Sequence, residues 1–438
     1  MSARSCCLGM LLWTATTAAW ADSASPQTAP LGQGYAGTGV NVAIFRQASL
    51  VTFGDTQYAA FYDGQARMVL AKRPLGSPQW QTRPTRYSGN VRDVHNVISL
   101  GIDGKGILHV SWDHHNNPLN YCRSVEPGSL ELTDRLPMTG AERAVCYPQF
   151  YGLPNGDLLF LYRTGGSGAG DLMMNRYDCR TQRWTALANP IIAGQRERNA
   201  YWQAAIDPRT GAIHVSWCWR ERKGNADLKT NHDVCYARSD DGGQTWLRSD
   251  GTRYALPITL DNAEVAWPVP QQSNLANMTS MAVDGRGRPY IVNNWRPAGE
   301  PTDQVHLVFR DGSRWQLRRV GGRQGYPLDL AKPNGFTLSR PLVVIDRQGR
   351  VIVILRDAAR GSRISAAISQ GADCRTWRLV ELTSQSVGDW EPTHDAAVWQ
   401  RDNVLHLFVQ KCLIGYPRPS PQTAPEPVFV LQWRPPEP

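Results

Sequence analysis

The chain has 438 residues and a formal net charge of +9, and 41% of its residues are apolar, which is enough for a sizeable core. Trp (16), Tyr (15), Gly (39) and Pro (30) are abundant, a profile typical of many short strands joined by tight turns. The basic residues are spread out and form no long run, so the charge disfavours nucleic acid as a partner and suits an acidic polysaccharide better.

The N-terminus, MSARSCCLGMLLWTATTAAWADS, has the features of an export signal. Arg4 precedes an apolar stretch, and Ala19-Trp20-Ala21 is a small-residue cleavage site. The stretch is too short to span a bilayer comfortably, which disfavours a membrane anchor. We therefore expect a signal peptide over residues 1–21 and a secreted or periplasmic protein that is not held in a membrane.

Seven similar segments recur along the chain, each a Gly, Asp or Asn turn followed by a short apolar or alternating strand. They are GDTQYAAFYDG (54–64), GKGILHVSWDH (104–114), NGDLLFLYRTG (155–165), TGAIHVSWCWR (210–220), GRGRPYIVNNW (285–295), RQGRVIVILRD (347–357) and RDNVLHLFVQK (401–411). The recurrence of one pattern along the chain predicts a repeat architecture. The strand-like periodicity of the segments excludes a helical solenoid. We predict an all-β fold, a seven-bladed β-propeller, as a single domain over residues 22–438.

Two further segments support a propeller. Ser239, Asp241, Gly243, Thr245 and Trp246 in SDDGGQTW fit the Asp-box turn S-x-D-x-G-x-T-W that joins outer strands of many blades, and GADCRTW (371–377) is a degraded copy. Near the C-terminus, VFVLQW (428–433) follows a Pro-rich stretch and is expected to return as the strand that closes the ring.

Adjacent histidines end one of the seven strands, in ILHVSWDHH (107–115). If the strand stays regular, His109 and His115 share one face and His114 takes the other. His109 is mid-strand and is expected to be a packed core residue, whereas His115 lies at the strand end. His95, in DVHN (93–96), is 20 residues before His115 and is expected in the same repeat unit.

The next repeat carries a tyrosine and an arginine. Tyr147 precedes Pro148, which predicts an extended backbone at Tyr147. Arg163 ends the following strand, and the glycines of TGGSGAGD after it allow a ligand to approach the backbone closely. Both residues could equally be structural, as a packed aromatic and a partner of a carboxylate.

A candidate zinc site lies in HVSWCWRERKGNADLKTNHDVCYARS (214–239). His214, Cys218, His232 and Cys235 offer two nitrogens and two sulfurs, and four protein ligands would make the zinc structural. Buried cysteines with unrelated histidines explain the same residues equally well. Seven cysteines remain after the signal peptide, so at least one has no disulfide partner.

The motifs DVHN, HVSWDHHNNPLNY, CYPQF, YRTGGSGAGD, NHDVCYARSDDGGQTW and GDWEPTHD together resemble those of the seven-bladed propeller polysaccharide lyases that include the ulvan lyases, with BNR-type repeats. The resemblance runs from about residue 90 to residue 412. It implies an active site of His95, His115, Tyr147 and Arg163 and a structural metal in the region of the candidate zinc site. Residue type adds candidate substrate contacts, among which Trp390 suits stacking on a sugar but suits packing within a blade as well. The residues expected to contact the substrate are Asn96, His114, Arg220, Trp390 and His394.

Those residue types suit β-elimination on a uronic acid chain. The reaction needs a group that neutralises the carboxylate, a base for the C5 proton and an acid for the departing O4. Arg163 can bind a carboxylate bidentately, and histidines and a tyrosine can exchange protons. We favour His95 as base and Tyr147 as acid. No organic cofactor is expected; the identity of the uronate polymer and the oligomeric state stay open.

Two other functions compete with this interpretation. A sialidase-like glycoside hydrolase would also be a propeller with Asp-boxes, but the chain has one clean Asp-box and no F/Y-R-I-P start. A non-catalytic carbohydrate-binding propeller would keep the aromatic residues without needing His95, His115, Tyr147 and Arg163 together.

Overall fold

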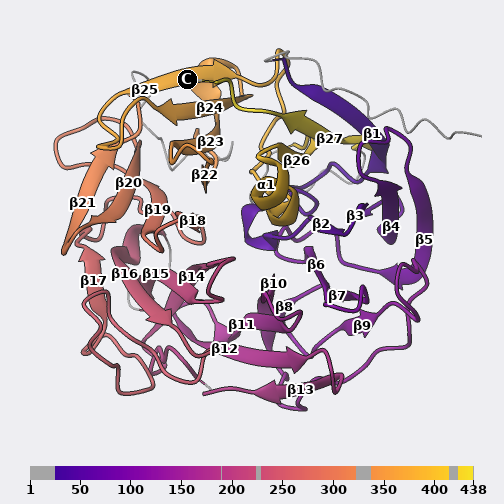
Figure 1. The fold of residues 1–438 in the computed structure, drawn as a ribbon, viewed down its shortest axis with the longest axis horizontal. Helices are drawn as coiled ribbons and strands as arrows, with labels where there is room; N and C mark the ends of the chain where they lie inside the picture. Colours follow the sequence, from indigo (N-terminus) through magenta and orange to yellow (C-terminus); the bar gives the residue numbers. More distant parts are fainter. Residues whose placement is uncertain (1–24, 189, 223–227, 322–336, 414–422, 438) are drawn as a thin grey trace, which may run out of the picture.

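The computed structural model describes residues 25–188, 190–222, 228–321, 337–413 and 423–437. Short antiparallel sheets stand side by side around a central axis, as the blades of a propeller do (Figure 1). One of the six sheets has nine strands and contains two blades, joined by the parallel pair Gly170–Asn199, so the blades number seven. The predicted seven-bladed propeller is confirmed, and the predicted signal peptide lies outside the described residues.

The first four blades follow one another along the chain, and most have four strands. The first holds β2 (Leu50–Phe53), β3 (Thr56–Tyr62), β4 (Arg67–Pro74) and β5 (Gln81–Ser88), and the second holds β6 (Ile98–Ile102), β7 (Leu108–Trp112) and β9 (Tyr121–Arg123). The third holds β10 (Val145–Gly152), β11 (Leu158–Gly166), β12 (Ala169–Asp178) and β13 (Arg183–Ala186), with β8 (His115–Asn117) added beside β10. The fourth holds β14 (Arg198–Ile206), β15 (Ile213–Glu221), β16 (Asn231–Ser239) and β17 (Glu264–Trp267).

The last three blades complete the circle. The fifth holds β18 (Ser280–Val283), β19 (Pro289–Trp295), β20 (Gln304–Asp311) and β21 (Arg314–Arg319), and the sixth holds β22 (Leu342–Ile345), β23 (Val351–Asp357), β24 (Arg363–Ser369) and β25 (Trp377–Glu381). The seventh holds β26 (Leu405–Gln410), β27 (Glu426–Trp433) and β1 (Gln27–Gly34). Short 3-10 turns are η1 (Ile44–Arg46), η2 (Leu228–Thr230) and η3 (Ala358–Arg360).

Each of the seven predicted repeats contains one strand at the same place in its blade, namely β3, β7, β11, β15, β19, β23 and β26. These strands are almost wholly buried, because a blade packs against a neighbour on both faces. That explains why they read as continuous apolar runs rather than as a clean alternation. In the seventh blade, α1 (Ala396–Asp402) lies on the inner side of β26, where the other blades have their innermost strand (Figure 1).

The ring closes where the two ends of the chain meet. The strand expected over 428–433 is β27, and it pairs antiparallel with β1 from Gln27↔Gln432 to Gly34↔Glu426. These backbone hydrogen bonds hold β1 in the seventh blade, and because the chain continues from β1 into the first blade, the pairing connects the first and last blades. Among the described residues, no helix is long and apolar enough to cross a membrane.

The Asp-box forms the turn between β16 and β17, as predicted. The Asp241 carboxylate accepts hydrogen bonds from the backbone N–H groups of Gln244 and Thr245 and from the hydroxyls of Ser239 and Thr245, over distances of 2.7–3.0 Å. Trp246 beneath it is completely buried. The degraded copy at 371–377 occupies the same turn of the sixth blade, between β24 and β25. All seven described cysteines are free thiols.

We predict that Asp241→Ala destabilises the protein by about 1–2 kcal/mol, because several hydrogen bonds to one carboxylate are lost at a site open to solvent. Asp240→Ala is the matched control, since the neighbouring Asp240 makes a single ion pair with Arg238 at 3.3 Å. Denaturant unfolding of the two variants measures the difference. Equal stabilities would contradict the structural role of the Asp-box.

Candidate active site

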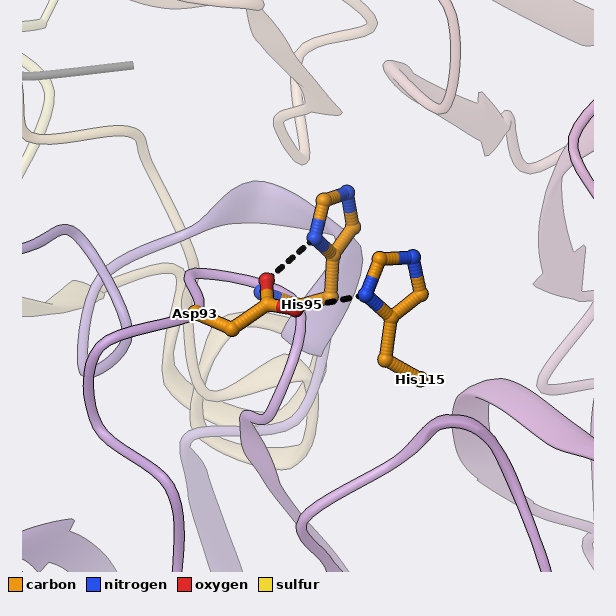
Figure 2. Close-up of side chains that lie close together, drawn as sticks. All are labelled: Asp93, His95 and His115. Atoms are coloured by element: carbon orange, nitrogen blue, oxygen red, sulfur yellow. Dashed lines mark hydrogen bonds and ion pairs between the residues drawn. The ribbon is translucent and has the colours of Figure 1, made fainter. Parts of the chain in front are cut away.

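Three polar side chains meet on the inner side of the second and third blades (Figures 1 and 2). Asp93 and His95 belong to the loop before β6, and His115 begins β8. The Asp93 carboxylate lies beside the two imidazoles and bonds to both, with one oxygen 2.5 Å from Nδ1 of His95 and the other 2.5 Å from Nδ1 of His115. The two imidazole rings stack, with centroids 4.0 Å apart.

One carboxylate thus orients two histidines. Because a carboxylate only accepts, both Nδ1 atoms carry the proton, and the lone pair of each neutral imidazole is then on Nε2. Asp93 was not singled out from the sequence, although it lies two residues before His95 in the DVHN motif. That spacing was the signal: an aspartate on the same turn as a candidate base.

The charges of the three groups depend on one another. Burial raises the pKa of Asp93, but the hydrogen bonds from His115 and His95 outweigh it and hold that pKa well below its usual range. Burial lowers the pKa of His95, and the positive charges of His115 and Arg340 lower it further, while Asp93 opposes them. His95 is therefore poised as a neutral base near neutral pH.

Phe45, in η1, supports His95 from behind. Its ring stacks on the His95 imidazole at 5.7 Å and meets the Tyr147 ring edge-on at 5.0 Å. The Arg340 guanidinium also lies over the Phe45 ring, 5.0 Å from its centroid. Arg340 is paired with Glu391 at 2.5 Å, and Glu391 also accepts from the backbone N–H of Ile44 at 2.9 Å. The GDWEPTHD motif thus contributes Glu391 to the surroundings of the site.

Tyr147 and Arg163 lie beneath the histidines. The Tyr147 ring is 5.6 Å from that of His95, and the Arg163 guanidinium is 5.0 Å from the Tyr147 ring centroid. Both residues are nearly inaccessible, at 4% and 1% exposed, whereas the His115 side chain is 41% exposed. The structure thus brings together the four residues expected at the active site, with His115 outermost.

The extended backbone expected at Tyr147 is wrong. Its φ is +54°, in the left-handed region, and the pairing of β10 with β11 shifts register between Cys146 and Gln149. A bulky residue rarely adopts this conformation, and the strain costs about 1–3 kcal/mol. A local irregularity in the strand thus overrides the preference set by Pro148 and aims the phenol toward Arg163.

The regular strand expected through His115 is also wrong. β7 ends at Trp112, and the left-handed residues Asp113 (φ +64°) and Asn116 (φ +69°) turn the chain into β8. His115 then pairs with Cys146 of β10, in the next blade. This crossing between blades, not strand alternation, places His115 beside Tyr147. His109 is fully buried and bonded to the Tyr121 hydroxyl at 2.7 Å, which confirms its predicted core role.

Three of the residues expected to contact the substrate are buried and hydrogen-bonded within the protein. His114 is fully buried, and its Nε2 accepts from the backbone N–H of Asn120 at 3.0 Å. Asn96 is 5% exposed and donates to the backbone of Asn90 at 2.9 Å. Trp390 has no exposed surface, because it packs in the core and donates to Phe408 O at 2.7 Å. Each of them is held by bonds within the protein, and its contact with a substrate stays a prediction.

The other two expected substrate contacts differ from each other. His394 is half-buried and bridges to Leu407 of β26, and burial lowers its pKa to about 4. Arg220, at the end of β15, is half-exposed and lies over the Tyr201 ring at 4.5 Å. Tyr201 in turn bonds to Arg163, so Arg220 is part of the same cluster as the four central residues.

The expected zinc ligands do not come together. Alternation along β15 puts His214 and Cys218 on one face, while Cys235 and His232 of β16 lie opposite Trp217 and Trp219, on the other face. His214 bonds to the Tyr236 hydroxyl at 2.8 Å, and His232 is held by Glu221 and Asp233 at 3.0 and 2.9 Å. The four-ligand site is therefore a wrong prediction, because the two pairs of ligands are separated by the sheet itself.

Within the described parts of the chain, the His, Cys, Asp and Glu group that could hold a metal ion is Asp93, His95 and His115. Their ligand atoms lie within 4.8 Å of one another, and two imidazoles with one carboxylate suit a divalent transition metal. A metal there would use the atoms that otherwise make the hydrogen bonds between Asp93 and the histidines.

Parts of the sequence match known proteins. Residues 56–323 match the family described as BNR repeat-containing family member. The chain belongs to this family. The short isoform of ulvan lyase from Alteromonas sp. (strain LOR) is 31% identical over 234 residues, which are 41% of this chain and 44% of that protein. The chain spans less than half the length of the curated relatives that head the comparison.

Solved structures show the same fold. An ulvan lyase of polysaccharide lyase family PL25, bound to -[GlcA(1-4)Rha3S]-, has a TM-score of 0.66 at 14% identity, over 88% of this chain and 96% of the other. The polysaccharide lyase Uly1 has a TM-score of 0.64 at 14% identity, over 88% and 89% of the two chains. The expected relation to ulvan-lyase-type propellers is thereby confirmed.

We predict that Asp93→Asn lowers the pKa of His95 further, because the carboxylate that favours the imidazolium is removed. Proton NMR of the histidine ring signals, followed against pH, should show His95 below its ordinary 6.5 in the wild type and lower still in the variant. Asp103→Asn is the control and should affect His109, its partner at 3.5 Å, but not His95. A rise of the His95 pKa in Asp93→Asn would refute the orientation described here.

Proposed function

We propose that this protein is a polysaccharide lyase that cleaves a uronate-containing chain by β-elimination at the cluster of Asp93, His95, His115, Tyr147 and Arg163. The observation that carries the proposal is the pair of histidines oriented by one carboxylate, directly above a tyrosine and an arginine. The relation to ulvan lyases supports the reaction class, and an ulvan-type polymer of uronic acid and sulfated rhamnose is the substrate we favour.

Each group has a task in such a reaction. His95, neutral and with its lone pair on Nε2, takes the C5 proton next to the carboxylate. Tyr147 keeps its proton because burial raises its pKa well above 10, and it delivers that proton to the departing O4. Arg220, half-exposed, is the guanidinium that a substrate carboxylate meets first, and Arg163 lies behind it. When protonated, the exposed His115 can donate from Nε2 to the enolate-like intermediate.

The way the site is exposed to solvent also fits a polymer substrate. His115 and Asp93, with side chains 41% and 30% exposed, are open to solvent, while Tyr147 and Arg163 are shielded. Shielded charges act more strongly on a bound anion than solvated ones do. We propose further that the protein is exported, as the sequence of residues 1–21 suggests, and meets its polymer outside the cytoplasm.

The test is to incubate purified protein with a panel of uronate polysaccharides, ulvan first, and to look for unsaturated products. Elimination creates a double bond conjugated to the carboxylate, which absorbs in the ultraviolet, whereas hydrolysis does not. New reducing ends without this absorbance would show a hydrolase, and binding without new ends would show a lectin-like protein. Either result would rule out the proposed lyase.

We expect Tyr147→Phe to lower turnover about 100-fold or more, the scale of a lost general acid, while the fold survives the loss of one hydroxyl. Tyr151→Phe is the matched control on the same strand, since Tyr151 bonds to Gln149 at 2.6 Å, away from the histidines. Steady-state rates and thermal unfolding of both variants separate chemistry from stability. Near-normal turnover in Tyr147→Phe would disprove the acid role.

A bound divalent metal would compete with the proposed chemistry, because it would occupy Asp93 and both imidazoles. We therefore expect lyase activity to persist after treatment with EDTA, to fall when Zn²⁺ is added, and to recover when the metal is chelated again. Loss of activity with EDTA and recovery with Zn²⁺ would instead show that the triad works as a metal centre.

A further inference from the structure

Tyr201, on β14, is the meeting point of two arginines, Arg163 of β11 and Arg220 of β15. Nη1 of Arg163 and Nη1 of Arg220 donate to its phenolic oxygen at 3.2 and 3.1 Å. Both guanidiniums also lie over its ring, with distances to the centroid of 5.6 and 4.5 Å. The Ser167 hydroxyl is 3.3 Å from the same oxygen, and Tyr147 bonds to it as well.

The other partners of these arginines carry no formal negative charge. Arg163 donates to Gly165 O at 3.1 Å and to the Cys146 thiol at 3.2 Å. Arg220 donates to the amide oxygens of Asn231 and Asn277, at 2.8 and 3.1 Å. Within the described residues, neither guanidinium forms an ion pair with a carboxylate, in contrast to Arg340, which has Glu391.

Two cations so placed need a counter-charge. Tyr201 and Arg163 are each 1% exposed, so water compensates little of the charge, and an uncompensated buried charge is costly. The ionisable groups facing this point are the Tyr201 and Tyr147 phenols and the thiols of Cys146 and Cys218. One of them is the candidate to supply a negative charge.

The surroundings single out Tyr201 among the four. Burial raises the pKa of Tyr147, of Cys146 and of Cys218, the last to about 12. Burial also raises the pKa of Tyr201, but the charges of Arg220 and Arg163, with hydrogen bonds from Ser167 and Tyr147, outweigh it and lower that pKa below 10. The phenol that accepts from both arginines is thus the one most readily deprotonated.

We propose that Tyr201 is the internal counter-anion of Arg163 and Arg220, releasing its phenolic proton to solvent in the substrate-free protein and taking one proton back when a substrate carboxylate binds at Arg220. The binding of a substrate carboxylate at Arg220 rests on the proposed function, whereas the ionisation of the Tyr201 phenol does not. The exchange balances: one carboxylate replaces one phenolate as the partner of the arginines, and one proton enters from solvent.

Such an exchange would affect the reaction without Tyr201 touching the substrate. The phenolate accepts from the Tyr147 hydroxyl, so Tyr147 stays protonated and oriented before binding. Once the carboxylate has arrived and Tyr201 is protonated, Tyr147 is released to donate to the leaving oxygen. Tyr201 is therefore a positioning residue, one that couples the arrival of the carboxylate to the readiness of the acid.

The decisive experiment is an ultraviolet titration of tyrosinate in the substrate-free protein. One of the 15 tyrosines should ionise below the ordinary value of about 10. This single equivalent should vanish in Tyr201→Phe, persist in Tyr236→Phe and move to higher pH in Arg220→Gln. Cys146→Ser should leave it in place, which separates the phenol from the thiol as the counter-anion.

Titrating again with glucuronate as the probe tests the coupling. Saturating glucuronate should shift the early tyrosinate to higher pH in the wild type, and Tyr201→Phe should show no corresponding signal. If wild type and Tyr201→Phe ionise alike below pH 10, the counter-anion is refuted; if glucuronate leaves the wild-type titration unmoved, the exchange is refuted. Neither readout requires turnover, so failure of the lyase assay would be recognised separately.

Discussion

The pairing of β1 with β27 is the constraint on which the rest of the structure depends. It joins residues near the two ends of the described chain, and its backbone hydrogen bonds turn a row of blades into a ring. In a ring, the innermost strands and the loops beside them converge on one axis. Segments of different blades can then meet, such as the loop that carries His95, the start of β8 at His115 and β11 at Arg163.

Within that ring, the site is organised by where charge is balanced and where it is not. Asp93 is hydrogen-bonded to both histidines, and Glu391 forms an ion pair with Arg340. Among the described groups, the partner that Arg163 and Arg220 have in common is the Tyr201 phenol, and neither arginine pairs with a carboxylate. Under the proposed function, these two arginines are where the carboxylate of an anionic sugar would bind. The left-handed backbone at Tyr147 adds a second sign of a built site, since strain of this kind persists only where the surroundings enforce it.

Much of the fold could be predicted from sequence, because a blade strand buried on both faces leaves a recognisable apolar run after a turn. His95, His115, Tyr147 and Arg163 were named through the resemblance of their motifs to those of a known family. The failures have local causes. The irregular strand around Tyr147 overrides the extended backbone that Pro148 predicts. The zinc ligands fit a donor set, but the pairing of β15 and β16 separates them.

The sequence did not predict all of the residues that the fold brings into contact. Asp93 and Tyr201 gain their importance only from the partners that the fold brings to them, and neither stands out in its own segment. Left-handed turns at Asp113 and Asn116 likewise decide which of the two adjacent histidines faces the site, and no periodicity argument anticipates them.

The central claim is that this site breaks a glycosidic bond by elimination and not by adding water. Mass spectrometry of the fragments released from ulvan tests it most directly. Elimination predicts fragments whose new non-reducing end lacks the elements of water, so that the fragment masses add up to the mass of the chain that was cut. A gain of one water for each bond cleaved would contradict the account.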